Sequence, residues 1–217
     1  MKLSEKYRPK FLSEVCGQPE VRKLQGFVRN PYPSCWLLES GPGTGKTSCA
    51  YALAADLGCT DDWSGLHTVV ASRFGVDEAS KMFFQTLPLR PMQGRGWKVL
   101  VIEELEYLSP SCVNVLKVAL EHQLPAKTVV VATSNDTTKL PVALYERFTV
   151  LYFNSGPEFA EASQDTLLEI WAEESGNAPL PACWSSWGWY GNDSFSFRRA
   201  LDEMQQELLA VGPVVMA

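Results

Sequence analysis

The chain has 217 residues and a formal net charge of −6; 46% of its residues are hydrophobic and 20% are charged. This length suffices for one large domain, or for a large and a small one. The acidic balance argues against a surface that coats nucleic acid, but it leaves room for a local basic patch. No apolar run approaches the roughly 20 residues that a membrane-spanning helix needs, so we expect no membrane partner.

Cysteine usage and the N-terminal sequence indicate the compartment. The six cysteines are scattered, mostly in apolar segments, and no two of them form a C-x-x-C pair. Such thiols are typically reduced and buried, which indicates neither a disulfide framework nor a zinc site. Residues 1–6 lack the apolar core of a secretion signal. We therefore expect a cytoplasmic protein.

The first predicted elements lead into a glycine-rich loop. A helix is expected around residues 21–28, which have apolar side chains at helical spacing and are followed by prolines. An apolar run over residues 35–38 predicts a buried strand, and an Ala- and Leu-rich run over residues 48–57 predicts a helix. Between them lies Ser-Gly-Pro-Gly-Thr-Gly-Lys-Thr at residues 40–47. Strand, glycine-rich turn and helix in this order are the context of a phosphate-binding loop.

This loop predicts a site for ATP with Mg²⁺. The glycines let backbone N–H groups approach the phosphates, and the following helix N-terminus carries a partial positive charge. Lys46 would reach the β- and γ-phosphates, and the Thr47 hydroxyl would bind Mg²⁺. Ser40 departs from the pattern, which has glycine there, and the alternative is a glycine-rich turn that contains Gly-Lys-Thr by chance. The expected nucleotide-binding residues of the loop are Gly41, Pro42, Gly43, Thr44, Gly45, Lys46, Thr47 and Ser48.

A near-continuous apolar run over residues 97–104 predicts a second buried strand, which ends in the carboxylates Glu103 and Glu104. Open α/β sheets bind their ligands at the carboxyl ends of the strands. We assign Glu103 to the Mg²⁺ shell and Glu104 to positioning and polarising the attacking water, with Lys46 as the other catalytic candidate. Asp is the usual residue at the first position, and the alternative is a strand that ends in solvated acids.

The remaining elements complete an α/β pattern. Further strands are expected over residues 66–70, 128–135 and 149–153, and helices over residues 76–87, 111–123 and 140–148. Five strands that alternate with helices indicate a doubly wound parallel sheet. Beyond a break at residues 154–157, only helices are expected, over about 158–175 and 194–211. We therefore predict a nucleotide-binding α/β domain at residues 1–154 and a lid domain at residues 155–217.

Seven short motifs occur in an order that resembles AAA+ ATPases. They are Glu-Lys-Tyr-Arg-Pro at residues 5–9, Gly-Gln at 17–18, the phosphate loop, the acidic pair at 103–104, Ser-Asn at 134–135, Glu-Arg-Phe at 146–148 and Phe-Arg-Arg-Ala-Leu at 197–201. Within that family, the chain is most similar to small subunits of replication-factor-C-type sliding-clamp loaders, including archaeal and phage relatives. The resemblance covers residues 3–211 and implies a five-stranded parallel sheet flanked by helices, followed by a small all-helical lid.

The resemblance also implies roles for individual residues. Asn135 matches the first sensor, next to the attacking water or the γ-phosphate, and Arg198 matches the second sensor on the lid. Arg147 matches an arginine finger offered to the ATP of a neighbouring subunit, although Glu-Arg-Phe replaces the family's Ser-Arg-Cys. The alternatives are an asparagine that opens a turn and solvated arginines. The residues expected to flank the adenine are Tyr7, Arg8, Pro9, Val15 and Gly17.

A finger supplied by a neighbour implies an oligomer of AAA+ subunits, in a ring or a spiral. Family members also track duplex DNA, and Arg73, Lys81 and Ser111 are the candidates here, although such residues are more often only solvated. The apolar cluster at residues 82–84 could dock a sliding clamp, with core packing as the alternative. An aromatic group within residues 184–190 could bind a partner, but we favour its use as the lid core.

Three functional hypotheses remain open. The first is an ATP-hydrolysing subunit of a clamp-loader-like complex that assembles on primed or duplex DNA. The second is a nucleotide-gated scaffold with weak or no hydrolysis, and the third is a DNA remodeller or a helicase- or transposase-targeting ATPase. Subunits of this family continue past the lid into a helical collar that holds the ring together, and we do not expect that collar here. Contacts between AAA+ domains or a partner's collar could hold the ring instead, or the sequence could be truncated. A phage or a virus could encode such a protein, which would be associated with the nucleoid or with replication.

Overall fold

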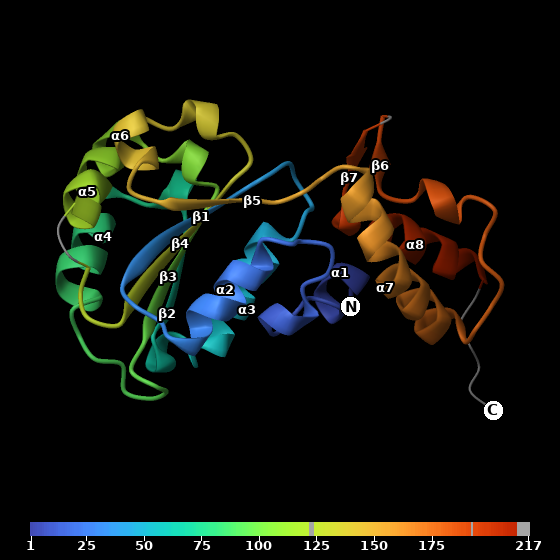
Figure 1. The fold of residues 1–217 in the computed structure, drawn as a ribbon, viewed down its shortest axis with the longest axis horizontal. Coiled ribbons are helices and arrows are strands. Elements are labelled where there is room, and N and C mark those ends of the chain that lie inside the picture. The colour runs from blue at the N-terminus through green and yellow to red at the C-terminus, as the bar shows by residue number, and fades with distance from the viewer. Residues whose placement is uncertain (122–123, 192, 212–217) are drawn as a thin grey trace.

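The computed structural model describes residues 1–121, 124–191 and 193–211, and its centre is a sheet of five parallel strands. The strands are β1 (Ser34–Glu39), β2 (Leu66–Val70), β3 (Lys98–Glu103), β4 (Thr128–Ser134) and β5 (Thr149–Tyr152). Their order across the sheet is β2-β3-β4-β1-β5 (Figure 1). The predicted parallel α/β sheet is therefore confirmed.

Helices cover both faces of this sheet (Figure 1). On one face lie α2 (Val21–Arg29) and α3 (Lys46–Asp56), and on the other lie α4 (Val76–Lys81), α5 (Pro110–Glu121) and α6 (Val142–Tyr145). Alternate strand residues enter the two resulting cores, as Leu37 and Leu38 show. Burial on both faces explains why the strands are continuously apolar.

Short 3₁₀ turns connect many of these elements. They are η1 (Leu12–Glu14), η2 (Asp62–Ser64), η3 (Ala71–Arg73), η5 (Leu105–Tyr107), η6 (Thr137–Lys139) and η7 (Trp184–Ser186). The helix expected over residues 76–87 is α4 followed by a π-helical turn, η4 (Met82–Thr86). Phe83 is buried there and Met82 is half-buried, while Phe84 is exposed. Core packing is thus confirmed for two of the three residues of the apolar cluster.

The part of the chain after residue 154 contains the two expected helices, α7 (Pro157–Ser175) and α8 (Phe197–Val211). It is not all-helical, because a short antiparallel hairpin of β6 (Trp189–Tyr190) and β7 (Ser194–Phe195) precedes α8. The helix expected from residue 194 therefore begins at Phe197. The hairpin orients Trp189 and Phe195 toward each other, with ring centroids 5.7 Å apart, so it supplies apolar surface to the lid.

Three of the four aromatic residues within 184–190, Trp184, Trp187 and Trp189, contribute to the lid core, as predicted. Trp187 is buried and packs 5.6 Å from Trp171, while Tyr190 is exposed. The N-terminal helix α1 (Leu3–Lys6) lies beside α7 and α8, and Leu3 belongs to the same core (Figure 1). The domain boundary at residue 154 stays a prediction. Helix α1 belongs to the first predicted domain but packs against the second.

Two expectations from composition can be compared with the described residues. All six cysteines are free, and only Cys183 is exposed, as expected for reduced thiols. Among residues 1–121, 124–191 and 193–211, no helix has both the length and the apolar character to cross a membrane.

Candidate nucleotide site

The phosphate loop lies between β1 and α3, as predicted. Gly43 has φ +75° and Gly45 has φ +90°, a left-handed conformation that side chains with a Cβ rarely adopt. Gly45 is the N-cap residue of α3, so the loop places Lys46 and Thr47 in the first turn of that helix. The local sequence therefore forms the expected turn because its glycines occupy the strained positions.

Lys46 is buried, with 6% of its surface exposed, and its ammonium donates three hydrogen bonds. It donates to the carbonyls of Ser40 at 2.8 Å and Gly41 at 2.6 Å, and to Oδ1 of Asn135 at 3.0 Å. Burial lowers the pKa of Lys46 to about 8, against the smaller opposing effect of the Glu106 charge. A lysine ammonium has three donors, so one of these bonds has to break before Lys46 can bind a phosphate.

The strand order explains why Lys46 meets Asn135. Since β4 lies between β3 and β1, the residues that follow these three strands share one sheet edge. Asn135 follows β4, and its backbone N–H and side-chain amide both donate to Oε1 of Glu106, at 3.0 and 3.1 Å. Glu106 is a site residue that the sequence analysis missed; the available signal was a third acid shortly after the pair at residues 103–104.

The acidic pair at the end of β3 has two distinct environments. Oε1 of Glu103 accepts a 2.8 Å hydrogen bond from the hydroxyl of Tyr51 in α3. Burial, and secondarily this carboxylate, raises the pKa of Tyr51 to about 12, so the hydroxyl stays a donor. Glu104 is exposed and has a left-handed backbone, with φ +57°, while its N–H donates to Oγ1 of Thr133 at 3.2 Å. Strain of this kind concentrates at functional sites.

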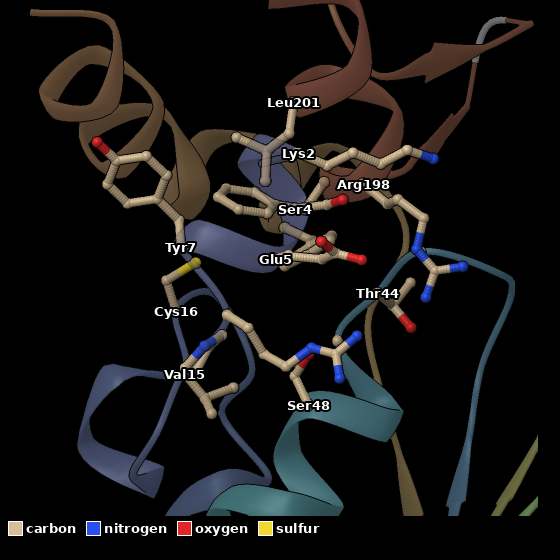
Figure 2. A pocket seen from close by; sticks show the side chains of 16 residues that line it. Lys2, Ser4, Glu5, Tyr7, Val15, Cys16, Thr44, Ser48, Arg198 and Leu201 are labelled. Atoms are coloured by element: carbon tan, nitrogen blue, oxygen red, sulfur yellow. The ribbon is translucent and has the colours of Figure 1, made fainter. Parts of the chain in front are cut away.

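A cavity of about 270 Å³ opens between the N-terminal segment, the phosphate loop and the lid (Figure 2). Most of the predicted nucleotide-binding residues line it: Tyr7, Arg8, Pro9, Val15, Gly43, Thr44, Gly45, Ser48 and Arg198. Figure 2 shows the Arg198 side chain directed from α8 toward Thr44. The neighbouring Arg199 points elsewhere, since it pairs with Glu203 at 2.6 Å and stacks on Tyr190.

Several predicted residues lie outside the lining of this cavity. Gly17 packs against the Phe159 ring, where a Cβ would come within 2.5 Å of that side chain. Gly41 and Pro42 border a second hollow beside the hairpin of the lid. The Tyr7 hydroxyl donates to Glu174 of α7, so this residue also ties the N-terminal segment to the lid.

Known families and structures identify the fold and its chemistry. The sequence model of the ATPase family associated with various cellular activities (AAA) matches residues 36–156, more than half of the chain. The chain belongs to the AAA ATPase family.

Among curated proteins, the chain is 28% identical to the replication factor C small subunit of Archaeoglobus fulgidus over 98% of this chain and 65% of that protein. It is 32% identical to the corresponding Picrophilus torridus subunit over 77% of this chain and 52% of that protein. It is also 30% identical to replication factor C subunit 3 of Saccharomyces cerevisiae, over 72% of this chain and 46% of that one. The chain thus spans about half to two thirds of the length of these relatives.

Solved structures support the fold. A variant of the RuvB protein of Thermotoga maritima superposes with a TM-score of 0.67 at 20% identity, over 94% of this chain and 67% of that one. A DNA polymerase III gamma subunit-related protein from the same organism gives 0.59 at 14% identity, over 88% and 56% of the chains. At these identities the likeness concerns the AAA fold alone.

In this AAA protein, the candidate finger Arg147 lies away from the phosphate-loop contacts. Its guanidinium pairs with Glu121 at the end of α5, at 3.3 Å, and its Nε is buried with no hydrogen-bond acceptor among the described residues. The candidate DNA contacts Arg73, Lys81 and Ser111 are all exposed. Asp77 and Glu78 occupy the first turn of α4, where they offset the partial positive charge that this helix start would present to a DNA phosphate.

The residues present fit a nucleotide with Mg²⁺. Ser40 Oγ, inside the loop, is buried without a partner in the described structure, and Arg198 turns a positive charge toward the cavity. The described residues contain no cluster of three His, Cys, Asp or Glu side chains that could hold a metal by itself. Mg²⁺ commonly binds through the substrate phosphates and one or two protein groups. Thr47 and Glu103 could supply these protein groups.

Proposed function

We propose that this AAA ATPase hydrolyses ATP as a subunit of an oligomer that works on DNA, in the manner of a clamp loader. The observation that carries the proposal is the junction of Lys46, Asn135 and Glu106 at the end of three adjacent strands. The lid adds Arg198 to the cavity that Gly43, Thr44 and Gly45 of the phosphate loop line. Similarity to replication factor C small subunits supports the cellular task.

The predicted residues divide the work of binding. A bound nucleotide would supply the phosphoanhydride bond, Lys46 and Arg198 would bind its phosphates, and Tyr7, Arg8, Pro9 and Val15, which line the cavity, would flank its base. Gly17 would act indirectly, since it packs against Phe159 in the cavity wall, and Thr47 and Glu103 would hold Mg²⁺. Glu104 is exposed at the sheet edge, where its carboxylate can orient and polarise the attacking water. Asn135 offers its Oδ1 to the same region.

Arg147 completes the site of a neighbouring subunit in this proposal. Its contact with Glu121 places it beside α5, whereas Lys46 contacts the phosphate loop and Asn135. An arginine finger is worth roughly 10³–10⁵ in rate in related phosphoryl transfers. An isolated protomer should therefore bind ATP but hydrolyse it slowly, and an oligomer on DNA should be faster. Arg73, Lys81 and Ser111 are the proposed DNA contacts, and the exposed Phe84 is the proposed clamp contact.

The test is steady-state ATP hydrolysis by the purified chain, alone and with primed DNA. Lys46→Ala and Glu104→Gln serve as controls that remove phosphate binding and water activation. We expect turnover that rises with DNA and disappears in both variants. ATP binding without turnover in every condition would reject the proposed activity.

One observation favours the second candidate, a nucleotide-gated scaffold that hydrolyses poorly. The Glu103 carboxylate is already engaged by Tyr51, so a metal has to compete with that hydroxyl. The substitution Tyr51→Phe removes the competing hydroxyl and keeps the aromatic ring. If the hydroxyl limits hydrolysis, Tyr51→Phe should lower the Mg²⁺ concentration for half-maximal turnover; an unchanged Mg²⁺ dependence would reject this explanation.

A further inference from the structure

Glu106 is an acid at this sheet edge that has no role in the proposed hydrolysis step. It lies in η5, after β3, and only 9% of its surface is exposed. Buried carboxylates are retained where they are paired or hydrogen-bonded. Here both hydrogen bonds come from a single residue, Asn135, and both reach the same oxygen, Oε1. The second oxygen, Oε2, is buried and accepts nothing from the described residues.

The chemistry of the partners fixes the orientation of the Asn135 amide. A carboxylate can only accept hydrogen bonds, so the group that faces Glu106 has to be the Nδ2 donor. A lysine ammonium can only donate, so the group that faces Lys46 has to be the Oδ1 acceptor. The two distances, 3.1 Å to Glu106 and 3.0 Å to Lys46, are those of ordinary hydrogen bonds. Glu106 therefore selects one of the two amide orientations.

We propose that Glu106 is a positioning residue, which holds Asn135 so that the amide oxygen faces the phosphate loop and which supports the Lys46 ammonium through the same contact. The proposal rests on the proposed function for its catalytic consequence, but not for the contact itself. With Glu106 in place, Asn135 presents an acceptor, which suits the attacking water or Lys46 more than a phosphate oxygen. Without Glu106, only the Lys46 contact holds this orientation, so the amide can rotate and present its donor once Lys46 turns to a phosphate.

Two variants separate position from charge. Glu106→Gln keeps an oxygen that can accept both bonds from Asn135 but removes the charge, whereas Glu106→Asp keeps the charge but shortens the reach. The contact is followed in nucleotide-free protein by the side-chain amide resonances of Asn135, assigned by comparison with Asn135→Ala. We expect Glu106→Asp to shift these resonances, because the shorter side chain loses the bond to Nδ2, and Glu106→Gln to shift them less. Glu103→Gln is the matched control, because Glu103 accepts a hydrogen bond from Tyr51 and not from Asn135.

Kinetics give the second readout. Glu106→Asp should lower kcat for ATP on the order of 10–100-fold with little change in KM, because the lost contact orients a group near the reacting atoms. In a double-mutant cycle, Glu106→Asp should lower kcat little further once Asn135 has been replaced by Ala.

The outcomes distinguish the two proposals. Absence of hydrolysis in the wild type would overturn the proposed function alone, because the Asn135 side-chain resonances still decide the role of Glu106. Unshifted Asn135 side-chain resonances in folded Glu106→Asp would overturn the present inference. Additive kcat losses in the double-mutant cycle would equally overturn it.

Discussion

The backbone N–H of Phe197, the first residue of α8, donates a 3.0 Å hydrogen bond to the carbonyl of Gly43 in the phosphate loop. The first N–H groups of a helix have no partner within the helix, so this bond uses a free donor of α8 to attach the lid to the loop. Ser196 caps the same helix by accepting from the Arg199 N–H at 3.2 Å, and its side chain lies directly over Gly43.

Gly43→Ala should detach the lid from the loop. A Cβ at this position would lie 1.8 Å from Oγ of Ser196 and 2.9 Å from its Cβ, on a backbone with φ +75°. We expect a loss of about 1–3 kcal/mol in the free energy of unfolding, together with weaker ATP binding. Urea denaturation and equilibrium ATP binding measure the two effects.

Gly26→Ala is the matched control for that substitution. Gly26 lies within α2, and nothing approaches within 4 Å of a Cβ there. Alanine should stabilise the helix by about 0.5–1 kcal/mol without altering ATP affinity. A Gly43→Ala protein as stable as the wild type would show that the Ser196 contact is easily displaced.

The buried Lys46 predicts a pH-dependent stability. Its folded-state pKa of about 8 lies below its ordinary 10.5, so the unfolded chain holds the proton over more of the range between them. Where the unfolded state binds more protons, stability rises with pH, so Lys46 destabilises the fold fully below pH 8 and progressively less up to pH 10.5. The Lys46→Met variant lacks this pH-dependent destabilisation. It should therefore be more stable than the wild type at pH 8, and the difference between the two unfolding free energies should shrink by roughly 3 kcal/mol up to pH 10.5.

Urea denaturation of nucleotide-free, reduced protein at several pH values between 7 and 10.5 measures that difference. The subtraction removes the titration of other lysines, tyrosines and thiols, which both proteins share. A difference that stays constant with pH would mean that Lys46 keeps an ordinary pKa.

Arg198 and Arg199 are adjacent but should differ in importance. Arg198 lines the cavity, whereas Arg199 is engaged with Glu203 and Tyr190 at the surface. Arg198→Ala should weaken ATP binding about 10–100-fold, which corresponds to about 1.4–2.7 kcal/mol, the range of a charge-assisted hydrogen bond. Arg199→Ala should leave affinity unchanged and have little effect on stability, as expected for an exposed ion pair. Equal affinities for the two variants, measured by isothermal titration, would exclude Arg198 from the site.

Arg147 and Glu104 should complement each other between subunits. A subunit with Arg147→Ala retains Glu104 to position the water, and a subunit with Glu104→Gln retains the Arg147 finger. If the finger acts on a neighbour, each variant alone should be inactive, while a 1:1 mixture should recover part of the wild-type turnover because some interfaces join an intact site to an intact finger. A mixture as inactive as its components, under conditions where oligomers form, would place Arg147 outside the site.

Local signals account for what could be predicted before the fold was known. Apolar runs gave the five strands to within about one residue at most ends, and glycines marked the phosphate loop. These features depend on neighbours in sequence: hydrophobic periodicity, and positive φ at Gly43 and Gly45. The lid was less predictable, because two-residue strands such as β6 and β7 are too short to show a period.

The phosphate loop, the acidic strand end and the parallel α/β architecture follow from local sequence, since each depends on consecutive residues. The contacts that those elements make with one another depend on the tertiary fold. The order β3-β4-β1 brings Glu106, Asn135 and Lys46 into one chain of hydrogen bonds, and the position of α3 brings Tyr51 to Glu103. Such contacts join residues far apart in the chain, and they form because packing both faces of the sheet fixes the strand order, which no local pattern encodes.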